Sequence, residues 1–141
     1  MSIRPLHHRF PRAGLDPLDS IDRMLPLVRT LVSDPPVPET FVVALDDARR
    51  GLAIAHVTGT TDPDHVLTVV ERFAVPDLCG GGGAGIVVVT CRPGGRVVVA
   101  DIDRWLEMSD LCDDAGIELV EWFVVARTIT CPRDLLGAPP R

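Results

Sequence analysis

The residues from Gly85 to Asp103, GIVVVTCRPGGRVVVADID, constrain the fold of this chain more than any other segment. Gly85–Thr90 is an uninterrupted apolar run of strand length, which a Pro-Gly-Gly loop and then the start of a helix follow. A strand without polar alternation is typical of the centre of a sheet that is covered on both faces. The segment therefore predicts an α/β protein in which helices pack on both sides of a sheet.

The preceding residues predict a hairpin and a helix. Phe41–Asp46 and Leu52–Thr58 are β-rich runs separated by a polar turn, which is a hairpin signal. Asp62 and Pro63 have the residue types of an N-cap and a first helical position, so we expect a helix over Asp64–Phe73. Its apolar residues recur at helical spacing: Val66, Val69, Val70 and Phe73.

A second helix and a last strand follow the glycine loop. We expect Asp101 or a neighbour to cap this helix and Gly116 to end it. Ile117–Val125 is the next strand. The predicted inward residues of the helix are Ile102, Trp105, Leu106, Ser109 and Cys112. The order β-β-α-β-α-β predicts a mixed sheet in two or three layers, with Trp105 and Trp122 in its core.

The first forty residues differ from the rest, because they hold seven of the thirteen prolines. We expect residues 1–17 to be irregular. Leu18–Val32 has one apolar helical face, and Pro26 either kinks this helix or marks a late start. That face carries Ile21, Met24, Leu25, Val28, Leu31 and Val32. The expected division is a Pro-rich arm over 1–40, a domain over 41–130 and a weakly specified tail over 131–141.

The strand and loop after Gly85 resemble the metal-binding segment of the RadC-like branch of the JAB/MPN/JAMM metalloprotease superfamily. In that family the strand ends in His-x-His-Pro-Ser-Gly, and a Ser and an Asp follow at fixed spacing. Aligned without a gap, the two His positions fall on Thr90 and Arg92, and the Ser and Asp positions fall on Ala100 and Asp103. The loop keeps the Pro and Gly of the family as Pro93 and Gly95.

Two further motifs extend this resemblance over residues 41–126. Gly59-Thr60 follows the hairpin, as in the family, and Gly116-Ile117-Glu118-Leu119 matches its Gly-Ile-x-Leu. The family's Val-His-Pro-Arg-Glu run is absent, and its Asp-His has become Glu121-Trp122. The resemblance implies that residues 41–130 are a RadC-like JAB domain. It also implies a JAMM/cytidine-deaminase-like layered sandwich with the order (α)-β-β-α-β-α-β.

The metal chemistry of the family is missing. Such enzymes hold zinc with two imidazoles and a carboxylate, and a Glu takes the proton of the bound water. Thr90 offers only a neutral hydroxyl, and Arg92 is a permanent cation with no lone pair to donate. No Glu stands between Glu39 and Glu71, and His56 alone cannot replace the ligands. We therefore expect no metal, no cofactor and no catalytic residue of the family type.

Three questions stay open about the cleft that would hold zinc in the family. Arg92 and Asp103 could form an ion pair where zinc is bound in the family, or Asp103 could simply favour the helix dipole. Cys91 could be an activated thiolate beside Arg92, or a small buried side chain. An enzyme of another class would have Cys91, Arg92, Asp103 and His56 as its only candidates.

Composition limits the partners. The chain has 141 residues, a net charge of −6 and no lysine, so phosphate binding to a basic stripe is disfavoured and nucleic acid is not expected. All 14 basic residues are Arg, which suggests a GC-rich bacterial source. There is no apolar run of membrane-spanning length and no signal peptide, so we expect a cytoplasmic protein. The glycine run before Gly85 precedes a strand and is not a phosphate loop.

These observations lead to one expected function with two alternatives. The chain is expected to be a non-catalytic JAMM-like domain that acts as a protein-binding or scaffold module. The alternatives are an enzyme of another class that reuses the degenerate cleft, and a purely structural homodimer. The cysteines Cys79, Cys91, Cys112 and Cys131 lack zinc-site spacing, and the paired His7 and His8 suggest at most adventitious metal binding.

Overall fold

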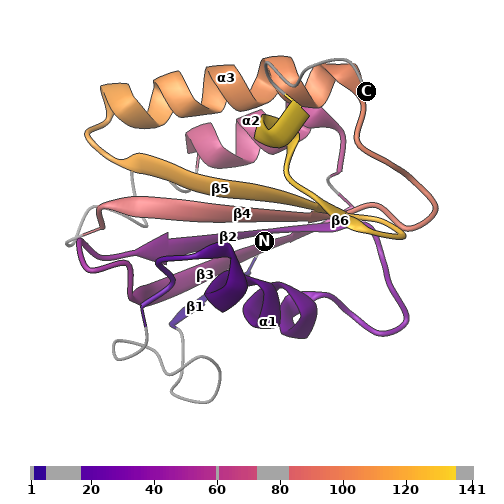
Figure 1. The fold of residues 1–141 in the computed structure, drawn as a ribbon, viewed down its shortest axis with the longest axis horizontal. Coiled ribbons are helices and arrows are strands. Elements are labelled where there is room, and N and C mark those ends of the chain that lie inside the picture. Colours follow the sequence, from indigo (N-terminus) through magenta and orange to yellow (C-terminus); the bar gives the residue numbers. More distant parts are fainter. Residues whose placement is uncertain (1, 6–16, 60, 73–82, 136–141) are drawn as a thin grey trace.

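The computed structural model describes residues 2–5, 17–59, 61–72 and 83–135. Six strands form one sheet in the order β1-β3-β2-β4-β5-β6 (Figure 1). The strands are β1 (Ser2–Pro5), β2 (Glu39–Leu45), β3 (Gly51–Thr58), β4 (Gly85–Cys91), β5 (Glu118–Val125) and β6 (Ile129–Thr130). The helices are α1 (Ile21–Leu31), α2 (Pro63–Val69), α3 (Val99–Asp114) and the short 3₁₀ helix η2 (Pro132–Leu135).

Strand β4 lies inside the sheet, as its apolar sequence predicts. It pairs antiparallel with β2 and parallel with β5, and all seven of its residues are buried. The parallel pair requires a crossover, which α3 supplies. The expected α/β class and mixed sheet are therefore confirmed.

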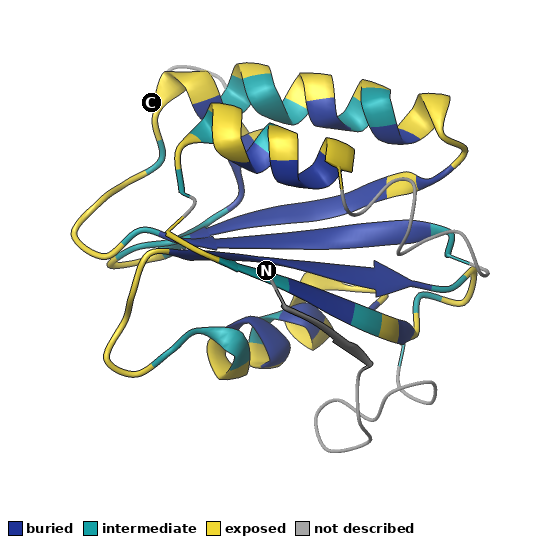
Figure 2. Cartoon of the chain, turned by 180° about the vertical axis from the view of Figure 1, so that it is seen from behind, coloured by how far each residue is buried: buried dark blue, intermediate teal, exposed yellow. Residues whose placement is uncertain are grey.

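The helices cover both faces of the sheet. Helix α1 lies on one face, whereas α2 and α3 lie on the other (Figure 1). Figure 2 shows that the inner sides of these helices are buried while their outer sides are exposed. Alternate residues of β2, β4 and β5 enter the two cores, as the pleat requires. Val42, Val88 and Trp122 pack under α2 and α3, and Phe41 and Val89 pack under α1.

Helix α1 begins at Ile21, which is earlier than the late start near Pro26 that one of the two predictions gave. Ser20 caps it by accepting the Arg23 N–H at 3.3 Å, and Pro26 lies inside it, so a start near Pro26 is wrong. The apolar face is also rotated, since Ile21 is exposed whereas Leu27 is buried. Asp62 and Pro63 start α2 as predicted. Of the inward face expected for α2, Phe73 lies outside the described residues.

Helix α3 turns a different set of residues toward the sheet from the set that the sequence predicts. It starts at Val99, so Asp101 is in its first turn and is not the cap. Leu106, predicted to face inward, is exposed, and Met108 is buried in its place. The difference arises because a carboxylate, Asp101, occupies an inward position that a sequence pattern reserves for apolar residues. Cys112 and Trp122 lie in the core as expected.

Short elements at both ends of the chain were not predicted. Residues 2–5, expected to be irregular, form β1 and pair antiparallel with β3. After β5, Ile129–Thr130 turns back as β6, and the first residues of the predicted tail form η2. In the part of the chain that the structure describes, no helix is both long enough and apolar enough to cross a membrane.

The end of α3 gives a test of this backbone. Gly116 has φ +78°, and its N–H and that of Ile117 bond to the Asp113 and Cys112 carbonyls, as in a Schellman motif. We expect Gly116→Ala to lower the free energy of unfolding by about 1 kcal/mol, because a Cβ disfavours left-handed backbone. Gly116→Asn should lose less than the Ala variant in urea unfolding. Equal stability of the Ala variant and the wild type would contradict this geometry.

Candidate functional site

The four positions that the resemblance aligns with the family's metal-binding motif do not converge. Thr90 is fully buried in β4, where its Oγ accepts the Trp122 indole N–H at 3.0 Å and lies 3.2 Å from the Thr40 hydroxyl. Ala100 and Asp103 are exposed on α3. Across the described ranges, no three His, Cys, Asp or Glu side chains form a group that could hold a metal ion. The donor set therefore does not fit the family's zinc.

Arg92, at the second His position, forms a buried ion pair with Asp101. Its Nη1 and Nη2 donate to the two carboxylate oxygens of Asp101, each at 2.6 Å. The Asp101 side chain has no exposed surface, and the Arg92 side chain is 10% exposed. Such a bidentate pair is among the stronger charge-assisted interactions in proteins.

The predicted pair of Arg92 with Asp103 is thus wrong in its partner. Residues two apart on a helix differ by about 200° in direction. Because Asp101 faces the sheet, Asp103 faces solvent. The alternative in which Asp103 lies in the first turn of this helix is not met either, because α3 starts at Val99 and Asp101 is the acidic residue of its first turn.

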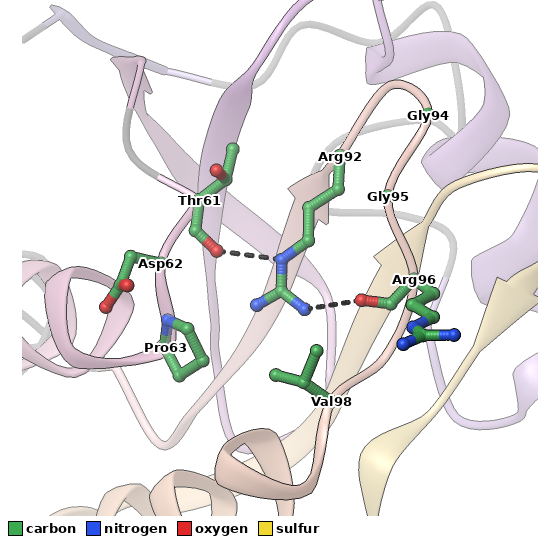
Figure 3. A pocket seen from close by; sticks show the side chains of 8 residues that line it. All are labelled: Thr61, Asp62, Pro63, Arg92, Gly94, Gly95, Arg96 and Val98. Atoms are coloured by element: carbon green, nitrogen blue, oxygen red, sulfur yellow. Dashed lines mark hydrogen bonds between the residues drawn. The ribbon is translucent and has the colours of Figure 1, made fainter.

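The guanidinium of Arg92 also holds backbone from two other segments. Its Nε donates to the Thr61 carbonyl at 2.8 Å, and Nη1 donates to the Arg96 carbonyl at 3.1 Å (Figure 3). Asp101 in turn accepts the Val98 N–H at 2.7 Å. One ion pair therefore ties together the end of β4, the segment before α2, the glycine loop and the first turn of α3.

An open pocket of about 590 Å³ lies beside this ion pair. Thr61, Asp62, Arg92, Arg96 and Val98 line it together with the glycines of the loop. The only carboxylate among these lining residues is exposed and accepts a backbone N–H at the start of α2. The pocket therefore presents backbone, apolar and cationic groups, without a base placed against a nucleophile.

Gly94 and Gly95 leave no room or no favourable backbone conformation for a larger residue in the loop after β4. A Cβ on Gly95 would lie 2.9 Å from the Arg92 Cβ and 3.2 Å from the Arg92 carbonyl oxygen. Gly94 has φ +71°, which side chains rarely adopt. This loop shape brings the Arg96 carbonyl to the guanidinium, so the Gly-Gly pair serves the ion pair.

His56 belongs to a separate cluster on the other face of the sheet. Its Nε2 lies 2.9 Å from Oε1 of Glu39, and its ring stacks on Phe41 with centroids 4.3 Å apart. Glu39 is fully buried and also accepts the backbone N–H and the hydroxyl of Ser33. The cluster joins the segment after α1 to β2 and β3.

Cys91 is not an activated thiol. It is 1% exposed, and burial, followed by the charge of nearby Glu39, raises the pKa of its thiol. Of the two alternatives for Cys91, the thiolate activated by Arg92 is wrong and the small buried side chain is what the structure shows. Successive residues of a strand point to opposite faces, so Cys91 faces α1 while Arg92 faces α3. The four candidates for an alternative enzyme site consequently do not share one pocket.

The structural roles of Glu39 and Glu121, and the pairing of Asp101 with Arg92, were not recognised from the sequence. Glu121 is 3% exposed, and its pKa is raised by burial. It lies 3.7 Å from the Arg133 Nε, and burial also raises the pKa of neighbouring Cys131 to about 12. A carboxylate inside an otherwise apolar strand is the signal that could have identified Glu121.

Of the remaining candidate side chains, only one lies in the part of the chain that the structure describes. His65 is exposed on α2, as its first-turn position predicts. His7, His8, Thr60, Cys79 and part of the glycine run lie outside the described residues. Comparison with known proteins does not change this picture, since no protein-family model and no curated protein matches the chain.

The ion pair can be tested with two neighbouring carboxylates. Asp101→Asn keeps an acceptor for the Val98 N–H but leaves the Arg92 charge without its partner. We expect it to lower the free energy of unfolding by about 3 kcal/mol. Asp103→Asn, on the exposed side of the same turn, should change it by no more than about 0.5 kcal/mol. Similar losses in both variants, measured by urea unfolding, would argue against the pair.

The raised pKa of Glu121 predicts how the free energy of unfolding depends on pH. A carboxyl group with a raised folded-state pKa holds its proton more tightly when folded, so stability declines as pH rises above the ordinary pKa of Glu. Glu121→Gln keeps an acceptor for the Trp122 N–H and removes this titration. Between about pH 4 and pH 7 the variant should therefore gain stability relative to wild type. Glu71→Gln, at an exposed position, is the control, and parallel pH profiles for wild type and Glu121→Gln would refute the assignment.

Proposed function

We propose that this chain is a non-catalytic, RadC-like JAB domain that acts in the cytoplasm as a protein-binding or scaffold module. The family part is supported by the order α1-β2-β3-α2-β4-α3-β5, which matches the order that the resemblance implies. It is also supported by the kept Pro93 and Gly95 between β4 and α3. On this proposal the fold is a layered sandwich of the JAMM/cytidine-deaminase kind.

One observation carries the functional part. The loop that bears metal ligands in the family pairs its charged groups with each other here, and it exposes apolar side chains to solvent. The Arg92–Asp101 pair satisfies the charged groups inside the loop. At the same loop, Val98 is 41% and Val99 is 79% exposed. Exposed apolar side chains beside a pocket are typical of binding surfaces. A site that has lost its donors and presents apolar groups favours binding over hydrolysis.

The enzyme alternative has less support. Its candidates are divided between the two faces of the sheet, since Cys91 and His56 lie on the α1 side and Arg92 lies on the α3 side. Cys91 has a raised pKa, and His56 already contacts Glu39. No side chain among the described pocket residues is poised as a nucleophile with a base.

The homodimer alternative uses the same apolar residues. A second copy of the chain could cover Val98 and Val99 as well as another protein could. The two cases differ in the mass of the purified protein, which light scattering after gel filtration measures.

Val99→Glu tests the proposed surface. Val99 is the first residue of α3, and Ile21, 42% exposed, is the first residue of α1, so Ile21→Glu is a matched control. A Glu in either first turn is compatible with the helix dipole, so both variants should stay folded. We expect a specific protein of the source cells to be recovered by cross-linking with wild type and Ile21→Glu, and about tenfold less with Val99→Glu.

Two results would contradict the module. Equal recovery of the same protein by all three baits would exclude this surface as the binding site. A wild-type dimer that becomes a monomer only in Val99→Glu would favour the homodimer instead.

A further inference from the structure

A second hollow adjoins the pocket and is basic. It has a volume of about 190 Å³ and lies between the glycine loop and the turn that joins β5 to β6. Gly95 and Arg96 line both the hollow and the larger pocket, so the two meet at the glycine loop and are together called the depression. Arg127 and Thr128, at the tip of the β5–β6 turn, line its other side.

Two of the three arginines that line this depression have no acidic partner among the described residues. Arg96 and Arg127 are exposed, and neither forms an ion pair with any residue that the structure describes. By contrast, Arg49, Arg92 and Arg104 each pair with a carboxylate. Among the described lining residues of both hollows, Asp62 is the only acid. In a chain of net charge −6, a depression with two unpaired cations is a local reversal of charge.

We propose that this depression binds an acidic, extended peptide segment of a protein partner. Guanidinium groups match carboxylates in geometry as well as in charge, so Arg96 and Arg127 would each take an Asp or Glu side chain. Thr128 and Thr130 add hydroxyls that can bond to the peptide backbone. Exposed Val98 suits an apolar side chain between the acidic ones. The inference rests on the proposed binding function and names the chemistry of its partner.

A peptide suits this surface better than a nucleic acid does. The phosphate backbone of a nucleic acid extends far beyond the depression, and the net negative charge of the chain would repel it. A short acidic segment engages only the two arginines and the apolar rim. The larger hollow alone, at about 590 Å³, is in the range of pockets that enclose small ligands, which is enough for a few side chains.

The test uses a fluorescein-labelled probe peptide with the sequence Glu-Leu-Glu-Glu-Leu-Glu and its counterpart in which every Glu is Gln. Anisotropy titration of the full chain should show binding of the acidic probe that weakens as salt increases. We expect the double variant Arg96→Glu/Arg127→Glu to weaken it by about tenfold or more. Arg50→Glu/Arg72→Glu carries the same charge change at two exposed sites outside both hollows and should keep the affinity within about threefold.

Four outcomes would overturn the proposal. These are no binding at millimolar probe, equal binding of the Gln peptide, equal weakening by the two double variants, or tighter binding of a single-stranded oligonucleotide than of the acidic probe. Arg96→Gln/Arg127→Gln, which removes charge without reversing it, should weaken the probe in the same direction and guards against misfolding. If Val99→Glu loses the cellular partner while Arg96→Glu/Arg127→Glu keeps it, the binding module stands and the acidic class of partner is wrong.

Discussion

The ion pair between Arg92 and Asp101 is the constraint on which the rest of this region depends. A buried guanidinium needs acceptors for its N–H groups, and here a carboxylate and two backbone carbonyls supply four of them. Those acceptors come from the segment before α2, the glycine loop and α3, so satisfying one side chain fixes three backbone segments. The glycines of the loop, the phase of α3 and the exposure of Val98 and Val99 all follow from this arrangement. A bound metal performs a comparable role when it draws ligands from separate segments, but it also supplies chemistry that an arginine cannot.

Much of the fold could be predicted because the pattern of each main element is local. The apolar run of β4, the hairpin of β2 and β3, the Asp-Pro start of α2 and the glycine end of α3 each contain their own signal. The elements that were missed have no such signal. Strands β1 and β6 have four and two residues, and they exist because neighbouring strands offer hydrogen-bond partners. Helix η2 likewise depends on contacts with β5 and α3, which a local pattern does not encode.

The sequence predicted which metal donors of the family are missing, but it did not predict which side chains contact one another. The replacement of donors at Thr90 and Arg92 could be read directly, since a hydroxyl and a guanidinium have defined chemistry. The partner of Arg92 depended on the phase of α3, which the apolar pattern placed wrongly by turning Leu106 inward instead of Asp101 and Met108. The pair of Glu39 with His56 joins two strands that only the sheet brings together. The environment of Cys91 depended on the pleat, which separates it from its neighbour in sequence.

The loop between β4 and α3 suits binding better than metal chemistry. The positions that would hold zinc in the family are buried, cationic or exposed in this chain, and the loop between them presents apolar and basic groups to solvent. The direct test is the zinc content of untagged protein purified without chelators, measured by elemental mass spectrometry against protein concentration. The account predicts zinc far below one atom per chain, unchanged in Asp101→Asn. Stoichiometric zinc in the wild type would contradict it, because the described residues bring together no group of three side chains that could hold a metal ion.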